Sequence, residues 1–143
     1  MPESDLHHLY PAHQSLNSSR GEHYYGVPVS QIRLLRLNEA GRLAADAEAG
    51  TETRSRRGRD ADNDIVFEPP AEHRGNAARA IFYISVRYEK ELPAKLERTL
   101  RQWHEDDLVD EEETLRCDEI KRIQGNRNLF VDRPELVELV EAF

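Results

Sequence analysis

The sequence has little of several features that would define its class directly. Its single cysteine, Cys117, excludes an internal disulfide, and the helix-forming residues around it favour a passive thiol over a nucleophile. No run of about 18 apolar residues is present, and no basic segment followed by an apolar stretch opens the chain, so neither a membrane span nor a signal peptide is predicted here. Positive charge is scarce too: 20 Lys and Arg stand against 28 Asp and Glu, a net charge of −8. This excludes a protein coated in positive charge for nucleic acid but allows a local basic groove.

What remains suits one polar domain of ordinary size, because 38% of the 143 residues are hydrophobic and 34% are charged. The most apolar segment, 76–88, predicts a central helix, and 94–104 carries Leu96, Leu100 and Trp103 at helical spacing. Asp110 with Glu113 forms an N-terminal capping pattern for a helix that Gly125 ends. Further helices are predicted over 12–19 and after Asp132, so the fold class is α+β and mostly α-helical.

Arginines raise two open questions. Arg79 lies in the first turn of the apolar helix and needs a partner, either a structural ion pair with Glu68 or Glu72, or a phosphate or carboxylate beside a site. Residues 31–65 have little apolar content and are interpreted as a surface excursion, with a hairpin that has a mobile tip as one form of it. Its arginines, including Arg56 and Arg57, either contact phosphates or are simply solvated. The acidic run 111–113 is explained by the preference of carboxylates for a helix N-terminus.

The opening segment, residues 3–20, gathers three histidines, an Asp, an Asn and an Arg, which suits metal or phosphate chemistry. His13 and Asn17 are four residues apart and lie on one face of the predicted helix. His7 and His8 point in opposite directions if the chain is extended, so both cannot face one metal. A zinc site built from the three histidines is the alternative, but no fourth ligand is spaced for it.

Several motifs, in this order, resemble the bacterial endonuclease I family. They are Asp5-Leu-His-His-Leu-Tyr-Pro11, Leu16-Asn-Ser-Ser-Arg-Gly21, Phe67-Glu-Pro-Pro-Ala-Glu-His-Arg-Gly-Asn-Ala-Ala-Arg-Ala80 and Gln124-Gly-Asn-Arg-Asn128. The resemblance implies a ββα-metal (His-Me finger) nuclease that hydrolyses DNA and RNA phosphodiester bonds without sequence preference, using Mg²⁺ or another divalent cation. It implies a secreted or periplasmic monomer with no membrane contact. One domain, 1–143, is expected, with the remaining part of the finger at 1–28, a variable surface excursion at 29–66 and a helical body at 67–143.

By the same resemblance Asn17 is the metal ligand. The family's Glu-His pair, whose His is the general base and whose Glu binds the metal, stands upstream of these motifs, and only Met1-Pro-Glu-Ser4 precedes Asp5. The sequence is therefore interpreted as N-terminally truncated and weakly active or inactive, with the catalytic residues unassigned and His8 as a candidate. The dipeptides Glu22-His23 and Glu72-His73 lie after the finger helix and are not expected to replace the pair.

The groups expected to contact nucleic acid are Arg20, Arg56, Arg57, Arg79 and Arg127, whereas Asn126 and Asn128 are expected to brace their loop. A noncatalytic nucleic-acid-binding or interaction module is the alternative function.

Overall fold

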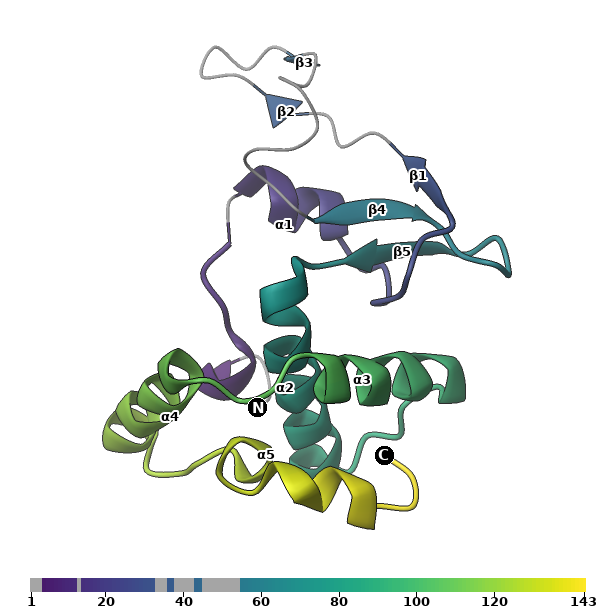
Figure 1. Cartoon of the computed structure of the whole chain (residues 1–143). Coiled ribbons are helices and arrows are strands. Elements are labelled where there is room, and N and C mark those ends of the chain that lie inside the picture. Colours follow the sequence, from purple (N-terminus) through teal and green to yellow (C-terminus); the bar gives the residue numbers. More distant parts are fainter. Residues whose placement is uncertain (1–3, 13, 33–35, 38–42, 45–54) are drawn as a thin grey trace. The chain divides into compact units, whose positions relative to one another are not determined.

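The computed structural model describes residues 4–12, 14–32, 36–37, 43–44 and 55–143, and its regular elements are mainly helices (Figure 1). The chain forms two compact units. Unit 1 comprises Met1–Tyr10 and Glu72–Phe143, and unit 2 comprises Pro11–Ala71. The mostly helical α+β class is confirmed, whereas the single domain stays a prediction. No helix in the described part of the chain combines the length and apolar character needed to cross a bilayer.

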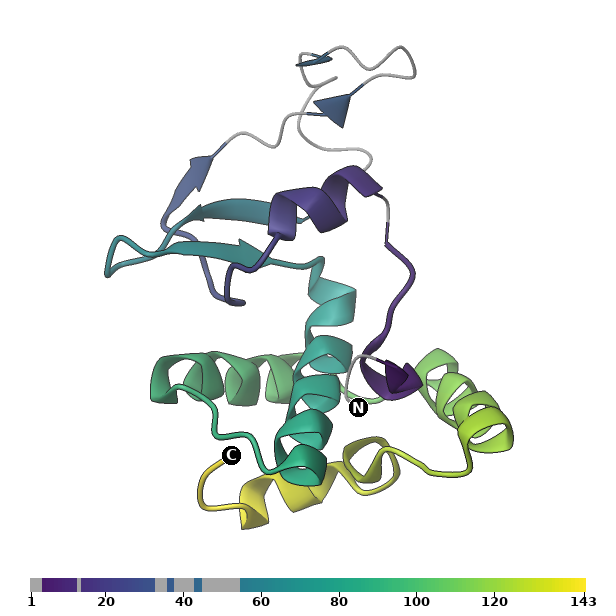
Figure 2. The ribbon, with the colours of Figure 1, turned by 180° about the vertical axis from the view of Figure 1, so that it is seen from behind.

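Unit 1 is a helical body arranged around α2 (Arg74–Tyr88). In both ribbon views α3 (Ala94–Asp106) lies on one side of α2, and α4 (Glu111–Gln124) lies on the other, next to the short 3-10 helix η2 (Leu6–His8) (Figures 1 and 2). The chain then continues through α5 (Leu129–Asp132) and the 3-10 helix η4 (Pro134–Leu139). Another 3-10 turn, η3 (Ala71–His73), precedes α2 directly.

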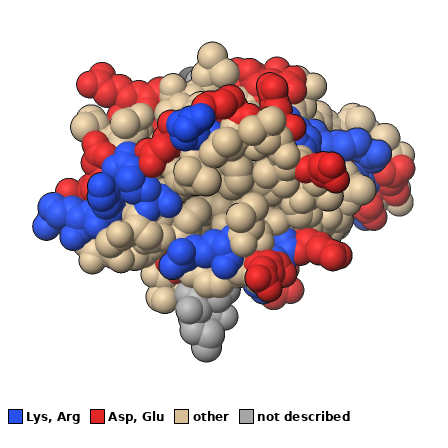
Figure 3. Space-filling view, turned by 90° about the horizontal axis from the view of Figure 1, so that it is seen from below, with Lys and Arg blue, Asp and Glu red and all other residues tan. Residues whose placement is uncertain are grey.

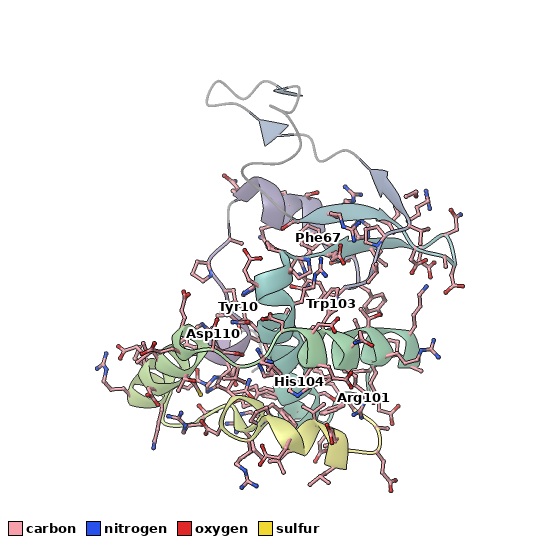
Figure 4. All side chains as sticks on the ribbon, viewed as in Figure 1. Tyr10, Phe67, Arg101, Trp103, His104 and Asp110 are labelled. Carbon is pink, nitrogen blue, oxygen red and sulfur yellow. The ribbon has the colours of Figure 1, made fainter. Side chains whose placement is uncertain are left out.

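Aromatic side chains fill the core of unit 1. Phe82 of α2 is fully buried, stacks on Phe143 with ring centroids 4.0 Å apart, and meets Phe130 edge-on at 6.1 Å. Trp103 is 2% exposed on α3, as its helical spacing predicted. Arg101 ties α3 to the chain end by donating to the carbonyl oxygens of Val137 and Val140, and the labelled side chains can be followed in Figure 4.

Local signals set the helix ends well. The Asp110 side chain accepts a hydrogen bond from the Glu113 N–H at 2.7 Å, and Gly125 ends α4 in a left-handed conformation with φ of 89°. Both ends of α4 are thus confirmed. The last helix is only partly confirmed, because Pro134 opens a 3-10 helix. The sequence interpretation missed α5, whose cap is Asn128, accepting from the Phe130 N–H at 2.9 Å.

Unit 2 contains α1 (Gln14–Arg20) and an antiparallel sheet of β1 (Ser30–Ile32), β4 (Arg56–Arg59) and β5 (Ile65–Glu68) in the order β1-β4-β5. A two-stranded ladder joins β2 (Arg36–Leu37) to β3 (Leu43–Ala44). The two ends of the expected surface excursion form the paired antiparallel strands β1 and β4, and the excursion itself stays a prediction. Gly58 permits their close approach, because a Cβ there would lie 1.7 Å from the Ser30 carbonyl oxygen. The middle of the excursion, 33–35, 38–42 and 45–54, lies outside the described residues.

Candidate functional site

The opening segment is fixed to unit 1 through Asp5. This residue is 4% exposed, and its carboxylate accepts hydrogen bonds from the hydroxyls of Tyr83 (2.8 Å) and Tyr88 (2.9 Å) and from Gln124 Nε2 (2.8 Å). It also caps η2 by accepting from the His7 N–H. Burial raises the pKa of Asp5, but these hydrogen bonds outweigh burial and lower it to about 2. Asp5 therefore stays ionised and serves as an anchor.

The histidines of this segment differ in exposure. His7 is 1% exposed, packs on the Tyr83 ring at 4.8 Å, and donates through Nε2 to the Asn126 carbonyl oxygen at 3.1 Å. Burial lowers its pKa, so the neutral form is favoured. His8 is exposed, and its candidacy as a catalytic residue stays a prediction. His13 lies outside the described residues. Within the described ranges no group of three or more His, Cys, Asp or Glu could hold a metal ion, so the zinc alternative gains no support.

Asn17 lies exposed on α1 in unit 2. Its main-chain carbonyl accepts from the Gly21 N–H at 2.9 Å, which closes the helix at the predicted stop. Its side-chain amide forms no hydrogen bond with any residue that the structure describes, so its oxygen is available to a ligand. Arg20 follows three residues later on the same helix and therefore lies next to it.

Three of the arginines predicted to contact nucleic acid are paired with carboxylates. Arg56 bonds Glu68, and Arg127 bonds both Asp118 and Asp132. Arg79 is fully buried and holds both carboxylate oxygens of Glu113, with Nη2 and Oε2 2.6 Å apart. The structural ion pair expected for Arg79 is confirmed, but its partner is Glu113 and not Glu68 or Glu72. A phosphate contact by Arg79 would require this pair to open.

Arg20 and Arg57 of unit 2 have different surroundings. The Arg20 Cζ atom lies 4.8 Å above the centre of the Tyr25 ring, and Arg57 donates from Nη2 to His23 Nε2 at 3.1 Å. Neither arginine forms an ion pair with a described residue. In the view of Figure 3, blue and red side chains are interspersed among tan ones. Arg20, on the helix that carries Asn17, and Arg57, on β4, thus carry positive charge that no described carboxylate neutralises.

Comparison with known proteins agrees with the motif order. The family model described as Endonuclease I matches residues 1–135. The chain belongs to the endonuclease I family. Two similar proteins are the extracellular ribonucleases of Bacillus subtilis (strain 168) and Bacillus amyloliquefaciens, each 31% identical over 94% of this chain. The chain spans just under half the length of these relatives, because the matches cover 45% of each.

Within this endonuclease I chain, the two Glu-His dipeptides have other partners. His73 packs edge-on against the Tyr10 ring at 4.7 Å, and burial lowers its pKa. His23 accepts the hydrogen bond from Arg57. The contacts of His23 and Tyr25 were not predicted from the sequence. The available signal was the row of ring side chains at 23–25 directly after Arg20.

Proposed function

We propose that this chain is a nuclease domain that hydrolyses phosphodiester bonds of RNA and DNA without sequence preference, with Mg²⁺ or another divalent cation. The observation that carries the proposal is the exposed side-chain amide of Asn17 on α1, which has no hydrogen bond to a described residue and lies inside a motif of the endonuclease I family. The relatives named extracellular ribonucleases support a nucleic-acid substrate and a secreted or periplasmic site of action. We also propose that the protein acts as a monomer.

A ββα-metal finger is the proposed fold of unit 2. Its support is the presence of α1 beside the end of the sheet that contains β4 and β5 (Figures 1 and 2). An amide oxygen is a hard ligand, and Mg²⁺ usually keeps several waters and takes only one or two protein ligands besides substrate phosphate. Asn17 fits that role and would hold the ion. The bound ion would supply charge neutralisation at the phosphate and the leaving oxygen.

Water attack on a phosphodiester also needs a base, usually an imidazole. In the described ranges His7 is buried against Asn126, and His23 accepts from Arg57. His73 and His104 lie in unit 1, where burial lowers the pKa of each. His8 is exposed and is the remaining candidate base among the described histidines. We therefore propose weak or no cleavage by this chain.

The second candidate is a noncatalytic nucleic-acid-binding module. The charges of Arg20 and Arg57, which no described carboxylate pairs, favour it, because phosphate contacts release counterions whether or not chemistry follows. Arg56, Arg79 and Arg127 remain proposed contacts that require their ion pairs to open.

The test uses the purified chain with plasmid DNA and with RNA, in Mg²⁺ and in EDTA. We expect slow cleavage that needs Mg²⁺ and disappears in Asn17→Ala, whereas the neighbouring exposed substitution Ser18→Ala leaves it unchanged. Cleavage that survives Asn17→Ala would show that the metal is held elsewhere. Salt-sensitive binding with no cleavage at any Mg²⁺ concentration would favour the binding module, and loss of binding at low salt would remove both candidates.

A further inference from the structure

We propose that Arg57 and Arg20 together form the phosphate-binding site of unit 2, and that His23 is the positioning residue that orients Arg57. The inference rests on the proposed function for its ligand, a backbone phosphate of nucleic acid. It adds a role for His23 and Tyr25, and it separates these two arginines from the other basic residues of the chain.

The first step is the distribution of charge. Seven arginines are paired with carboxylates, namely Arg56, Arg79, Arg87, Arg101, Arg122, Arg127 and Arg133. Arg20 and Arg57 are half-buried and have no carboxylate partner among the described residues. Arg116 of unit 1 also has no carboxylate partner among the described residues, but it donates to the carbonyl oxygens of Leu6 and Leu9. In the described part of unit 2, the two half-buried guanidiniums without a carboxylate are Arg20 and Arg57, and such local positive charge in a chain of net charge −8 suits a polyanion.

The second step is strand register. Arg57 pairs with Phe67 across the β4–β5 ladder, and Tyr25 forms a parallel bridge with Phe67 on its other side. Directly opposite residues in a sheet project from the same face, so Tyr25, Phe67 and Arg57 form one row. The His23 N–H bonds the Arg20 carbonyl oxygen at 3.1 Å, which holds the end of α1 against the start of this row. Both guanidiniums therefore belong to one face of unit 2.

The third step is hydrogen bonding. His23 can accept at Nε2 only in its neutral form with the proton on Nδ1, so the Arg57 bond fixes both its tautomer and the direction of the guanidinium. The Nε atoms of Arg57 and Arg20 are buried and have no hydrogen-bond partner in the described part of the chain. Buried donors in folded proteins are normally satisfied by protein, water or a ligand. A phosphate offers several acceptor oxygens that match the guanidinium fork.

The first experiment measures binding of a labelled single-stranded oligonucleotide by fluorescence anisotropy, in EDTA so that cleavage does not interfere. We expect Arg57→Gln to weaken binding about tenfold and to lower the slope of log affinity against log salt by about one. Arg59→Gln is the matched control, since Arg59 is exposed on the same strand and donates to the Asn63 carbonyl oxygen. Equal losses in the two variants would overturn the proposal in favour of diffuse charge.

The role of His23 is tested by two substitutions of similar size. His23→Phe keeps a ring but removes the acceptor, and we expect it to lose most of the affinity that Arg57→Gln loses. His23→Gln keeps an acceptor oxygen for Arg57 and is expected to retain near wild-type binding. The double variant His23→Phe with Arg57→Gln should be no weaker than Arg57→Gln alone. Additive losses, or failure of the Gln variant to rescue binding, would show that His23 has only a structural role.

A measurement on the unmutated chain avoids any folding defect of a variant. Titration with inorganic phosphate is followed through the Nε–H resonances of Arg20 and Arg57 by NMR, with chloride at equal ionic strength as the control. Saturable shifts of both resonances with phosphate alone are expected; unchanged resonances would overturn the proposal. A protein that passes this test but shows no Asn17-dependent cleavage would fail as a nuclease and keep its phosphate site. Asn17-dependent cleavage without these shifts would keep the proposed nuclease function and overturn the phosphate site of Arg20 and Arg57.

Discussion

Asp5 connects the first residues of the chain to the helical body of unit 1. Four hydrogen bonds converge on its carboxylate from His7 N–H, Tyr83, Tyr88 and Gln124, and Arg87 Nε lies 3.6 Å from it. The donors come from η2, α2 and α4, so one ionised group holds three elements together. Hydrogen bonds to a charged acceptor are stronger than neutral ones, which is why this arrangement is sensitive to protonation.

Asp5 should therefore make stability depend on acid pH. Its pKa is about 2 in the folded chain against an ordinary 3.8, so it contributes fully above pH 4 and loses its contribution as pH falls from 4 to 2. The shift corresponds to about 2 kcal/mol of unfolding free energy. Urea titrations should show that the free energy of unfolding of the wild type falls strongly between pH 7 and pH 3. The fall should be smaller for Asp5→Asn, which is already destabilised at pH 7. The exposed control Glu141→Gln should follow the wild type; an Asp5→Asn curve that did the same would contradict the anchor role.

The sequence showed that Arg79 needs a partner but could not show which one. Glu113 lies 34 residues away and already had a sufficient local explanation, since a carboxylate is favoured in the first turn of α4. Only packing of α2 near the start of α4 brings the two groups together. Asn17 is the opposite case, because its proposed role as a metal ligand rests on a contiguous motif.

At the scale of elements, α2 begins where the backbone passes very close to the end of α3. The Gly75 N–H donates to Asp107 Oδ2 at 2.7 Å, and Arg79 Nη1 donates to the Asp107 carbonyl oxygen at 2.8 Å. A Cβ at position 75 would lie 1.9 Å from that carbonyl oxygen. Glycine is needed here for space, and the Arg79 pair depends on the same approach.

Gly75→Ala should accordingly destabilise the protein by about 2–3 kcal/mol, as overpacking of a well-packed site does. Gly125→Ala is the control: its φ is 89°, but a Cβ there would meet nothing within 4 Å, so we expect only the backbone cost of about 1 kcal/mol. Chemical denaturation with circular dichroism measures both. Equal losses of stability in Gly75→Ala and Gly125→Ala would contradict the close approach at position 75.

Elements with local end signals were predictable, and those defined by pairing were not. Asp110 and Gly125 fix α4 from within its own sequence, and the apolar pattern fixes α2 to within two residues of its observed start at Arg74. Strand β4 reads Arg-Arg-Gly-Arg, which has no alternation of apolar and polar residues. Its strand conformation depends on β1 and β5, whose register cannot be read from β4 alone.

For the molecule as a whole, the apolar core is divided unequally between the two units. In the described part of unit 2 the buried hydrophobic residues are Val66 and Phe67, whereas unit 1 buries many more, with Phe82, Leu100 and Trp103 among them. Since buried apolar area supplies most of the free energy of folding, the two units should differ in local stability.

We therefore expect unit 2 to open at lower denaturant concentration than unit 1. Trp103, the only tryptophan, lies in unit 1, so its fluorescence reports unit 1 alone. Amide exchange reports both units: the Phe67 N–H, bonded to the Tyr24 carbonyl oxygen, should exchange faster than amides in the middle of α2. Inorganic phosphate should slow exchange at Phe67 and leave α2 unchanged, because a ligand stabilises only the unit that binds it when the units open separately. One transition shared by fluorescence and by both sets of amides, with equal protection by phosphate, would instead show that the two units unfold as one.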